Sequence, residues 1–144
     1  MRNNKISLVS GGFDPVHVGH LQLFQRARDM ADALFIILNS DNYLINKKGK
    51  PFMPFDERRI VLENFQMVDL VIPSIDTDET VCATLEHLAS LKEAIDSELY
   101  FCNGGDRPGG DVTPEHKLCK KLGIKTVYGL GDKIQSSSWL IKDD

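Results

Sequence analysis

The chain has 144 residues, a length that suits one domain with a substantial hydrophobic core. Apolar residues make up 42% of it and charged residues 26%, which is typical of a globular protein. The formal net charge of −4 argues against broad nucleic-acid binding, because such binding normally requires a basic face. Length and charge therefore predict a single domain spanning residues 1–144, with no nucleic acid among its partners.

The sequence shows no sign of a membrane span, an export signal or a disulfide framework. Its longest unbroken apolar run, Ala33 to Leu38, is far shorter than the roughly 20 residues of a membrane-spanning helix. The first residues, Met1 to Lys5, lack the apolar core of a signal peptide. The three cysteines are widely spaced, so neither a disulfide framework nor a cysteine metal site is expected. These features predict a cytoplasmic protein without a membrane partner.

Predicted strands and helices alternate along the chain. The strands are short apolar runs, and the helices carry apolar residues at helical spacing. A capping hydroxyl followed by proline, Thr113-Pro114, starts one helix, and Gly123 is expected to end it. We expect strands at residues 5–9, 33–38, 70–72, 99–102 and 125–128, and helices at 17–30, 54–65, 80–95, 113–123 and 136–141.

Alternating strands and helices with apolar strands predict a parallel sheet that helices cover on both faces. The expected fold is α/β, a Rossmann-like three-layer α/β/α sandwich with a mainly parallel five-stranded sheet. Ligands bind such sheets at the carboxyl ends of the strands, near the change in strand order. Glycine turns follow the first and fourth predicted strands, and a polar, lysine-rich loop follows the second. We therefore expect all three segments at one edge of the sheet.

The stretch from Ser10 to His20 combines a glycine turn with two histidines at a predicted helix start. His17 and His20 are three residues apart, so their side chains are expected on one face of the first helical turn. Gly19 between them would let a ligand approach the backbone closely. Imidazoles and backbone N–H groups at a helix N-terminus suit a phosphate. Two histidines without further ligands at suitable spacing make a poor zinc site, so phosphate chemistry is favoured over metal binding.

The sequence GGFDPVHVGH, from Gly11 to His20, resembles the GxFDxxHxGH signature of the cytidylyltransferase-like nucleotidyltransferases. That superfamily includes glycerol-3-phosphate cytidylyltransferase and the nucleotidyltransferase domain of ADP-heptose synthase. The resemblance implies an enzyme that transfers CMP or AMP from CTP or ATP to a phosphorylated sugar or polyol and releases pyrophosphate. It also implies Mg²⁺ bound through the nucleotide phosphates and water rather than through a dedicated metal site of the protein (metal-ligand residues: none), and a homodimer.

Further segments resemble family motifs in the same order along the chain, and the resemblance implies roles for their residues. Lys47 or Lys48 would contact the nucleotide phosphates, and spacing does not decide between them. Asp14 would orient the histidine cluster or help to hold Mg²⁺. The expected site comprises catalytic His17, His20, Lys47, Lys48 and Lys133; nucleotide-binding Gly11, Gly12, Phe13, Asp14, Gly19, Gly104, Gly105, Asp106, Ser136, Ser137 and Ser138; and acceptor-binding Arg58 and Asp14.

The last motif, around Lys133 to Ser138, departs from the family pattern R-x-x-x-I-S-T-T. No arginine lies upstream, Gln135 stands where isoleucine is common, and serines replace threonines. Lys133 would supply a point charge, whereas the arginine of the family motif can donate two hydrogen bonds from its planar guanidinium. These differences leave the choice between CTP and ATP open. They also keep a non-catalytic nucleotide-binding module as the alternative function. A likeness to the HIGH and KMSKS signatures of class I aminoacyl-tRNA synthetases is weaker, because the net charge is wrong for RNA.

Overall fold

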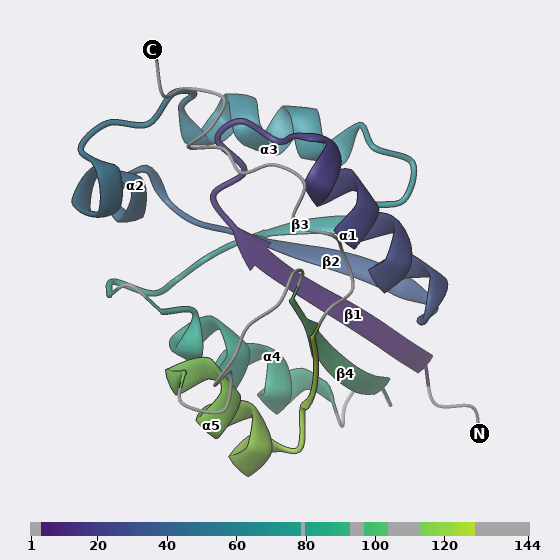
Figure 1. The fold of residues 1–144 in the computed structure, drawn as a ribbon. Helices are drawn as coiled ribbons and strands as arrows, with labels where there is room; N and C mark the ends of the chain where they lie inside the picture. The colour runs from purple at the N-terminus through teal and green to yellow at the C-terminus, as the bar shows by residue number, and fades with distance from the viewer. Residues whose placement is uncertain (1–3, 79, 93–96, 104–112, 129–144) are drawn as a thin grey trace.

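A computed structural model of the chain describes residues 4–78, 80–92, 97–103 and 113–128. Strands and helices alternate through these residues, except where two helices follow one another between the second and third strands (Figure 1). The strands are β1 (Asn4–Gly11), β2 (Ala33–Leu38), β3 (Leu70–Pro73), β4 (Ser97–Cys102) and β5 (Lys125–Val127). The helices are α1 (Val18–Asp29), α2 (Asp41–Lys48), α3 (Phe55–Glu63), α4 (Cys82–Lys92) and α5 (Pro114–Leu122).

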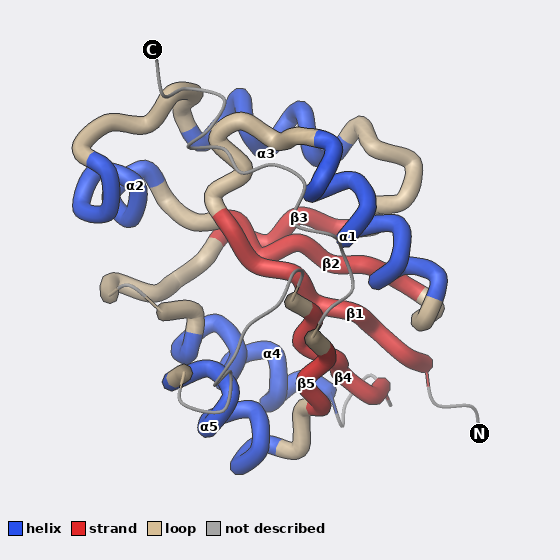
Figure 2. The backbone as a smooth tube through the Cα atoms, viewed as in Figure 1, coloured by secondary structure: helices blue, strands red, loops and turns tan. Residues whose placement is uncertain are grey.

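The five strands form one parallel sheet in the order β3-β2-β1-β4-β5. The chain proceeds outward from β1 to β3 on one side and then returns to the other side for β4 and β5. The strand order therefore reverses between β1 and β4, and the carboxyl ends at this point are where such sheets bind ligands. Helices α1 and α3 cover one face and α4 and α5 the other (Figure 2). The predicted three-layer α/β/α sandwich is confirmed.

The central strands are buried on both faces, as strand β2 illustrates. Its side chains alternate between the faces, so Leu34 and Ile36 pack with Phe24 of α1, while Ile37 packs with Leu85 of α4. All five side chains have 0% exposure. A strand covered on both sides needs a continuous apolar run, which is why residues 33–38 could be identified from the sequence.

Helix α2 was not predicted, because its residues were expected to form a polar, lysine-rich loop. The Ser40 hydroxyl accepts a hydrogen bond from the Tyr43 N–H at 3.1 Å and caps the helix start. Gly49, with φ of 92°, ends it and donates its N–H to Ile45 O at 2.8 Å. Only Leu44 is buried, so the helix has no apolar repeat for a sequence pattern to detect.

The predicted boundaries of α5 are confirmed by its caps. Thr113 Oγ1 accepts from the His116 N–H at 3.1 Å, and Gly123 adopts the left-handed conformation with φ of 78°. The predicted helix at 136–141 lies outside the described residues. None of the helices in the described part of the chain combines the length and apolarity needed to span a membrane.

Candidate active site

The glycine turn that follows β1 lies at the carboxyl end of the central strand and leads into the Asp14–His20 segment. A Cβ atom on Gly11 would lie 2.8 Å from the ring of Phe13, and one on Gly12 would lie 2.8 Å from Leu44 Cδ2. Phe13 has a positive φ of 49°, and its buried ring contacts His20 edge-on with ring centroids 4.9 Å apart. The turn is therefore closely packed, and it supports one of the two histidines.

His17 and His20 cap the start of α1 with their own rings. His17 is the N-cap residue rather than a helical residue as predicted, and its Nδ1 accepts from the Gly19 N–H at 3.1 Å. His20 Nδ1 accepts from the His17 N–H at 3.1 Å, and the two rings stack with centroids 3.8 Å apart. A neutral imidazole whose Nδ1 accepts a hydrogen bond carries its proton on Nε2. The network therefore assigns both histidines as Nε2–H donors.

Burial keeps these two rings uncharged. It lowers the pKa of His17, and together with the neighbouring His17 it lowers the pKa of His20 to about 3. Neutral imidazoles at pH 7 can donate hydrogen bonds from Nε2 but carry no positive charge. The buried His17 Nε2 has no hydrogen-bond partner among the described residues. An unpaired buried donor is costly unless a ligand satisfies it.

Asp14 ties the glycine turn to the segment that precedes α3. Its buried carboxylate accepts from the backbone N–H groups of Phe52 and Met53, each at 2.6 Å, and pairs with Lys48 Nζ at 2.8 Å. Burial alone would raise the pKa of Asp14, but the Lys48 and backbone hydrogen bonds outweigh it and lower the pKa. With both oxygens engaged and 2% of the residue exposed, Asp14 fits neither a Mg²⁺ ligand nor an acceptor contact.

Arg58 lies behind the glycine turn. Its Nη1 donates to Gly12 O and Asn39 O, each at 2.9 Å, and its Nε donates to Met53 O at 3.0 Å. Its Nη2 pairs with Asp41 Oδ1 at 2.8 Å. The side chain has 0% exposure, so it offers no surface to an acceptor. In this arrangement the residue holds together the main chain that forms the site, and the acceptor-binding role implied for Arg58 stays a prediction.

The structure separates the two candidate lysines. Lys48 is the partner of Asp14, to which it also donates at the main-chain oxygen at 3.1 Å. Lys47 Nζ lies 5.6 Å from the centroid of the Tyr43 ring and lines a cavity at the carboxyl ends of the strands. Of the two, Lys47 is the one with access to a ligand in this cavity.

This cavity, called the turn cavity below, has a volume of about 280 Å³. The glycine turn, Asn39, α2 and the end of β4 contribute to its wall. Asn39 is 5% exposed, and its Oδ1 has no hydrogen-bond partner among the described residues. A buried polar group without a partner beside a cavity supports the cavity as a ligand site. Its described lining residues are Ser10, Gly11, Gly12, Asn39, Tyr43, Lys47, Thr80, Val81, Phe101, Asn103, Thr113 and Glu115.

Part of the expected site is not described. Gly104, Gly105 and Asp106, and the last motif with Lys133, Ser136, Ser137 and Ser138, lie outside the described residues, so their roles stay predictions. Asn103, the last described residue before Gly104, lines the turn cavity. The sequence did not single out Asn39 or Tyr43 as site residues; their position directly after a buried strand was the available signal.

A parallel sheet in the order β3-β2-β1-β4-β5, with a glycine turn and paired histidines where the strand order reverses, defines a Rossmann-like α/β protein. The family assignment agrees with it. Residues 8–128 match the family model described as cytidylyltransferase-like, and the chain belongs to this family.

Two relatives illustrate the range of similarity. Glycerol-3-phosphate cytidylyltransferase of Staphylococcus aureus is 40% identical over 63 residues, which cover 44% of this chain and 48% of that protein. The bifunctional protein HldE of Wolinella succinogenes is 32% identical over 143 residues, which cover 94% of this chain and 28% of that protein. The chain therefore spans less than half of the length of either relative.

Solved structures share the fold. The lipopolysaccharide core biosynthesis protein from Thermoplasma volcanium matches with a TM-score of 0.67 and 18% identity, over 88% of this chain and 96% of that one. A putative nicotinate-nucleotide adenylyltransferase from Vibrio parahaemolyticus matches with a TM-score of 0.63 and 15% identity, over 96% of this chain and 84% of that one. At these identities the matches establish the fold alone.

Proposed function

We propose that the protein is a nucleotidyltransferase that transfers CMP or AMP from CTP or ATP to a phosphorylated sugar or polyol and releases pyrophosphate. The observation that carries the proposal is the pair of neutral, stacked histidines beside the glycine turn, each with its Nε2–H as donor. Family membership and the turn cavity next to these residues support it.

In the proposed reaction, a phosphate oxygen of the acceptor attacks the α-phosphorus of the triphosphate. The new P–O bond forms as the bond from the α-phosphorus to the leaving pyrophosphate breaks. An ionised phosphate is already a nucleophile, so neither a covalent intermediate nor a strong base is required. The protein positions two anions and stabilises the charge that moves between them.

The histidines and one lysine supply this stabilisation in the proposal. His17 and His20 donate from Nε2 to oxygens of the α- and β-phosphates as charge shifts toward the leaving group. Burial lowers the pKa of both rings in the free protein, so both histidines meet the triphosphate as neutral Nε2–H donors. Lys47 in the turn cavity provides a positive charge for the phosphates.

Mg²⁺ is proposed to enter with the nucleotide, where it would neutralise part of the triphosphate charge. No group of three or more His, Cys, Asp or Glu side chains in the described part of the chain is arranged to hold a metal ion. The carboxylate of Asp14 is already occupied by Lys48 and two backbone donors. Binding through phosphates and water is therefore the form that fits the residues at hand.

The choice of nucleotide is part of the proposal that the test must decide. The S. aureus relative is named a cytidylyltransferase, which indicates CTP, but its match covers only 44% of this chain. The match to the bifunctional relative covers 94% of this chain, but the name of that protein indicates no nucleotide. A homodimer, which the family resemblance implies, also belongs to the proposal, and sedimentation would measure it.

The test is pyrophosphate release in the presence of Mg²⁺, with CTP and ATP supplied separately against a panel of phosphorylated sugars and polyols. We expect release with one nucleotide and one class of acceptor, and its loss in His17→Ala. Gln25→Ala, a change at an exposed residue of the same helix, is the matched control. Triphosphate binding without release for any acceptor would contradict the proposal and favour a non-catalytic nucleotide-binding module.

A further inference from the structure

Two oppositely charged side chains line the turn cavity without pairing with each other. Lys47 of α2 and Glu115 of α5 both belong to its wall. Both lie in the described part of the chain, where no ion pair joins them. Helix α2 follows β2, whereas α5 follows β4, and β1 with its glycine turn lies between these two strands. The described wall is therefore cationic on the β2 side and acidic on the β4 side.

Glu115 is held by one hydrogen bond and has an oxygen to spare. It lies in the first turn of α5, where the helix dipole favours a carboxylate. Its Oε2 accepts from the N–H of Val81, directly before α4, at 3.2 Å. Within the described ranges, no group donates to its Oε1. A carboxylate accepts hydrogen bonds at both oxygens, so Oε1 can accept one from a ligand in the cavity.

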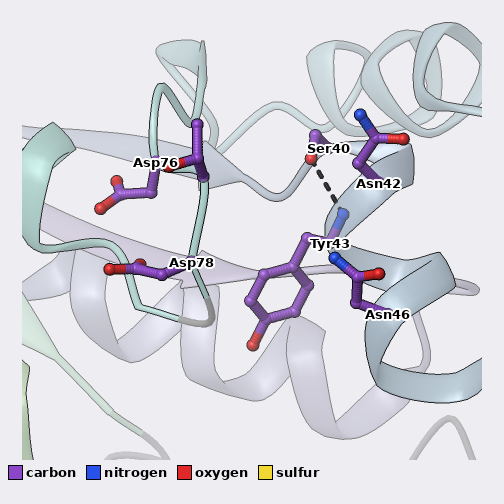
Figure 3. Close-up of a pocket in the computed structure, with 7 residues that line it drawn as sticks. Ser40, Asn42, Tyr43, Asn46, Asp76 and Asp78 are labelled. Atoms are coloured by element: carbon purple, nitrogen blue, oxygen red, sulfur yellow. Dashed lines mark hydrogen bonds between the residues drawn. The ribbon is translucent and has the colours of Figure 1, made fainter.

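Asp76 provides a contrast to Glu115. Figure 3 shows Asp76 on the wall opposite Tyr43 in a second cavity, of about 240 Å³, which Tyr43 lines together with the turn cavity. Oδ1 of Asp76 accepts from the Thr84 N–H at 3.0 Å, and its Oδ2 accepts from the Ala83 N–H at 2.7 Å. Both oxygens of Asp76 are thus used to cap the start of α4. Glu115 is the one carboxylate among the described residues of the turn-cavity wall, and it has only one donor.

Asn39 is independent evidence that a ligand belongs in the turn cavity. Its main-chain N–H donates to Gly11 O at 3.0 Å, and its main-chain O accepts from Arg58 Nη1 at 2.9 Å, so its backbone is fixed. Its side chain is buried in the cavity wall, and Oδ1 has no hydrogen-bond partner in the described part of the chain. A buried polar atom of this kind is costly unless a ligand satisfies it. A ligand of this cavity is therefore expected to bring hydrogen-bonding groups as well as charge.

A nucleoside triphosphate combines the groups that the two sides of this wall favour. Its phosphates are attracted by Lys47 and repelled by Glu115, so they belong on the β2 side and at the glycine turn. Its ribose hydroxyls and the exocyclic amine of cytosine or adenine are uncharged donors, which a carboxylate accepts. The charges of the wall therefore favour one orientation of the nucleotide in the cavity.

We propose that Glu115 determines which nucleoside triphosphates bind. The nucleoside lies on the β4 side of the turn cavity, and Glu115 Oε1 accepts a hydrogen bond from one of its uncharged donors, a ribose hydroxyl or the base amine. This inference rests on the proposed function, because it takes the ligand of the turn cavity to be a triphosphate. It does not depend on the identity of the acceptor.

Calorimetric titration of the full chain with Mg²⁺ and no acceptor measures nucleotide binding without transfer. CTP is compared with UTP and with its 2′-deoxy and 3′-deoxy forms, and ATP with inosine triphosphate and its own deoxy forms. We expect the loss of one donor to weaken binding to the wild type about tenfold, because a hydrogen bond to a charged group contributes at least this much. Weak binding of UTP or inosine triphosphate identifies the amine as the donor, and weak binding of a deoxy form identifies a hydroxyl.

Glu115→Gln separates this contact from the structural role of Glu115. The variant keeps one oxygen for the Val81 N–H and places an NH₂ group where Oε1 was, so its thermal unfolding midpoint should stay close to that of the wild type. The complete nucleotide should bind the variant about tenfold more weakly, whereas the analogue without the donor should bind variant and wild type equally. Glu86→Gln makes the same charge change at an exposed position of α4 outside the turn cavity, and it should bind every nucleotide like the wild type.

Three results would overturn the assignment. If Glu115→Gln bound every triphosphate more tightly by the same factor, Glu115 would lie beside the phosphates. If it bound every triphosphate more weakly by the same factor, Glu115 would act only through its link to Val81. If it matched Glu86→Gln throughout, Glu115 would not contact the nucleotide.

The outcomes also separate this inference from the proposed function. Donor-dependent binding that is lost in Glu115→Gln, without pyrophosphate release for any acceptor, would support the assignment and contradict the proposed function. Pyrophosphate release with the same nucleotide preference in wild type and Glu115→Gln would overturn the assignment and support the proposed function.

Discussion

Arg58 Nη1 donates hydrogen bonds to the main-chain oxygens of Gly12 and Asn39, each at 2.9 Å. Gly12 belongs to the turn after β1, and Asn39 directly follows β2, so one buried guanidinium joins the carboxyl ends of two neighbouring strands. The same two ends line the turn cavity. The geometry of the candidate active site therefore depends on a side chain that has no exposed surface of its own.

Arg58→Ala is expected to lower the free energy of unfolding by on the order of 3 kcal/mol, since it leaves several main-chain oxygens unpaired. Arg58→Lys should recover only part of this loss, because an ammonium group cannot reproduce the planar fork. Urea unfolding measures the free energy of unfolding of both variants. Arg59→Ala is the control, because Arg59 pairs loosely with the exposed Asp56 at 3.9 Å. Unchanged stability with a raised acceptor KM alone would restore the acceptor-binding role implied by the sequence.

Asp14→Asn is expected to destabilise the protein at neutral pH. The amide NH₂ group takes the place of one carboxylate oxygen, so a hydrogen-bond donor then faces a backbone N–H or Lys48. The pKa of Asp14 is lower in the folded protein than in the unfolded chain, where it is near 4. Ionised Asp14 therefore stabilises the folded state above about pH 4, and this stabilisation is lost as the pH falls through the lower pKa of the folded state. The stability difference between wild type and Asp14→Asn should thus shrink as the pH falls from 5 toward 3. A difference that stays constant over this range would exclude an ionised Asp14 as its origin.

The two lysines of α2 should behave differently when replaced by alanine. Lys48→Ala removes the cation beside the buried carboxylate of Asp14, so the thermal unfolding midpoint should drop. Lys47→Ala should leave that midpoint within about a degree and raise the KM for the nucleotide or acceptor, since Lys47 lines the turn cavity. The opposite pattern would assign the phosphate contact to Lys48.

His17 has a structural and a proposed catalytic contribution, and two variants separate them. His17→Ala removes both the N-cap and the Nε2–H donor, and turnover should fall roughly 100-fold or more, as on removal of a pre-organised donor. His17→Asn retains a side-chain acceptor for the Gly19 N–H, so it should be more stable than His17→Ala yet equally slow. Unfolding curves and pyrophosphate release measure the two effects. If His17→Asn turned over as fast as the wild type, His17 would contribute to turnover only through its N-cap hydrogen bond.

His20 is expected to stay neutral across the physiological range, since burial and the adjacent His17 lower its pKa to about 3. An unfolded histidine titrates near 6.5, so the contribution of neutral His20 to stability is present above pH 6.5 and declines as the pH falls toward 3. Nitrogen-15 NMR of the imidazole, assigned with His20→Gln, should show the Nε2–H tautomer from pH 5 to 8. A titration midpoint above 5 would contradict the buried, uncharged ring.

Local signals in the sequence identified most elements of the fold. The apolar run at 33–38 is a strand covered on both faces, and the Thr113-Pro114 start and Gly123 end of α5 are confirmed as caps. Helix α2 was missed because one buried residue, Leu44, produces no periodicity, although Ser40 and Gly49 carried cap signals at its two ends. The start of α1 differs by one residue because His17 serves as the cap.

The sequence by itself determined the five strands, four of the five helices in the described residues, the parallel sheet and the motif that marks its ligand-binding edge. These properties depend on periodicity and on residues close together in the chain. Only the tertiary structure decided which way the charged side chains point. Lys47 and Lys48 are neighbours in sequence, yet successive residues of a helix point about 100° apart, so Lys48 reaches Asp14 while Lys47 faces the turn cavity. Arg58 is buried because the main-chain oxygens of Gly12 and Asn39, both distant in the sequence, converge on it together with the nearby Met53 O, a convergence that only the packed fold creates.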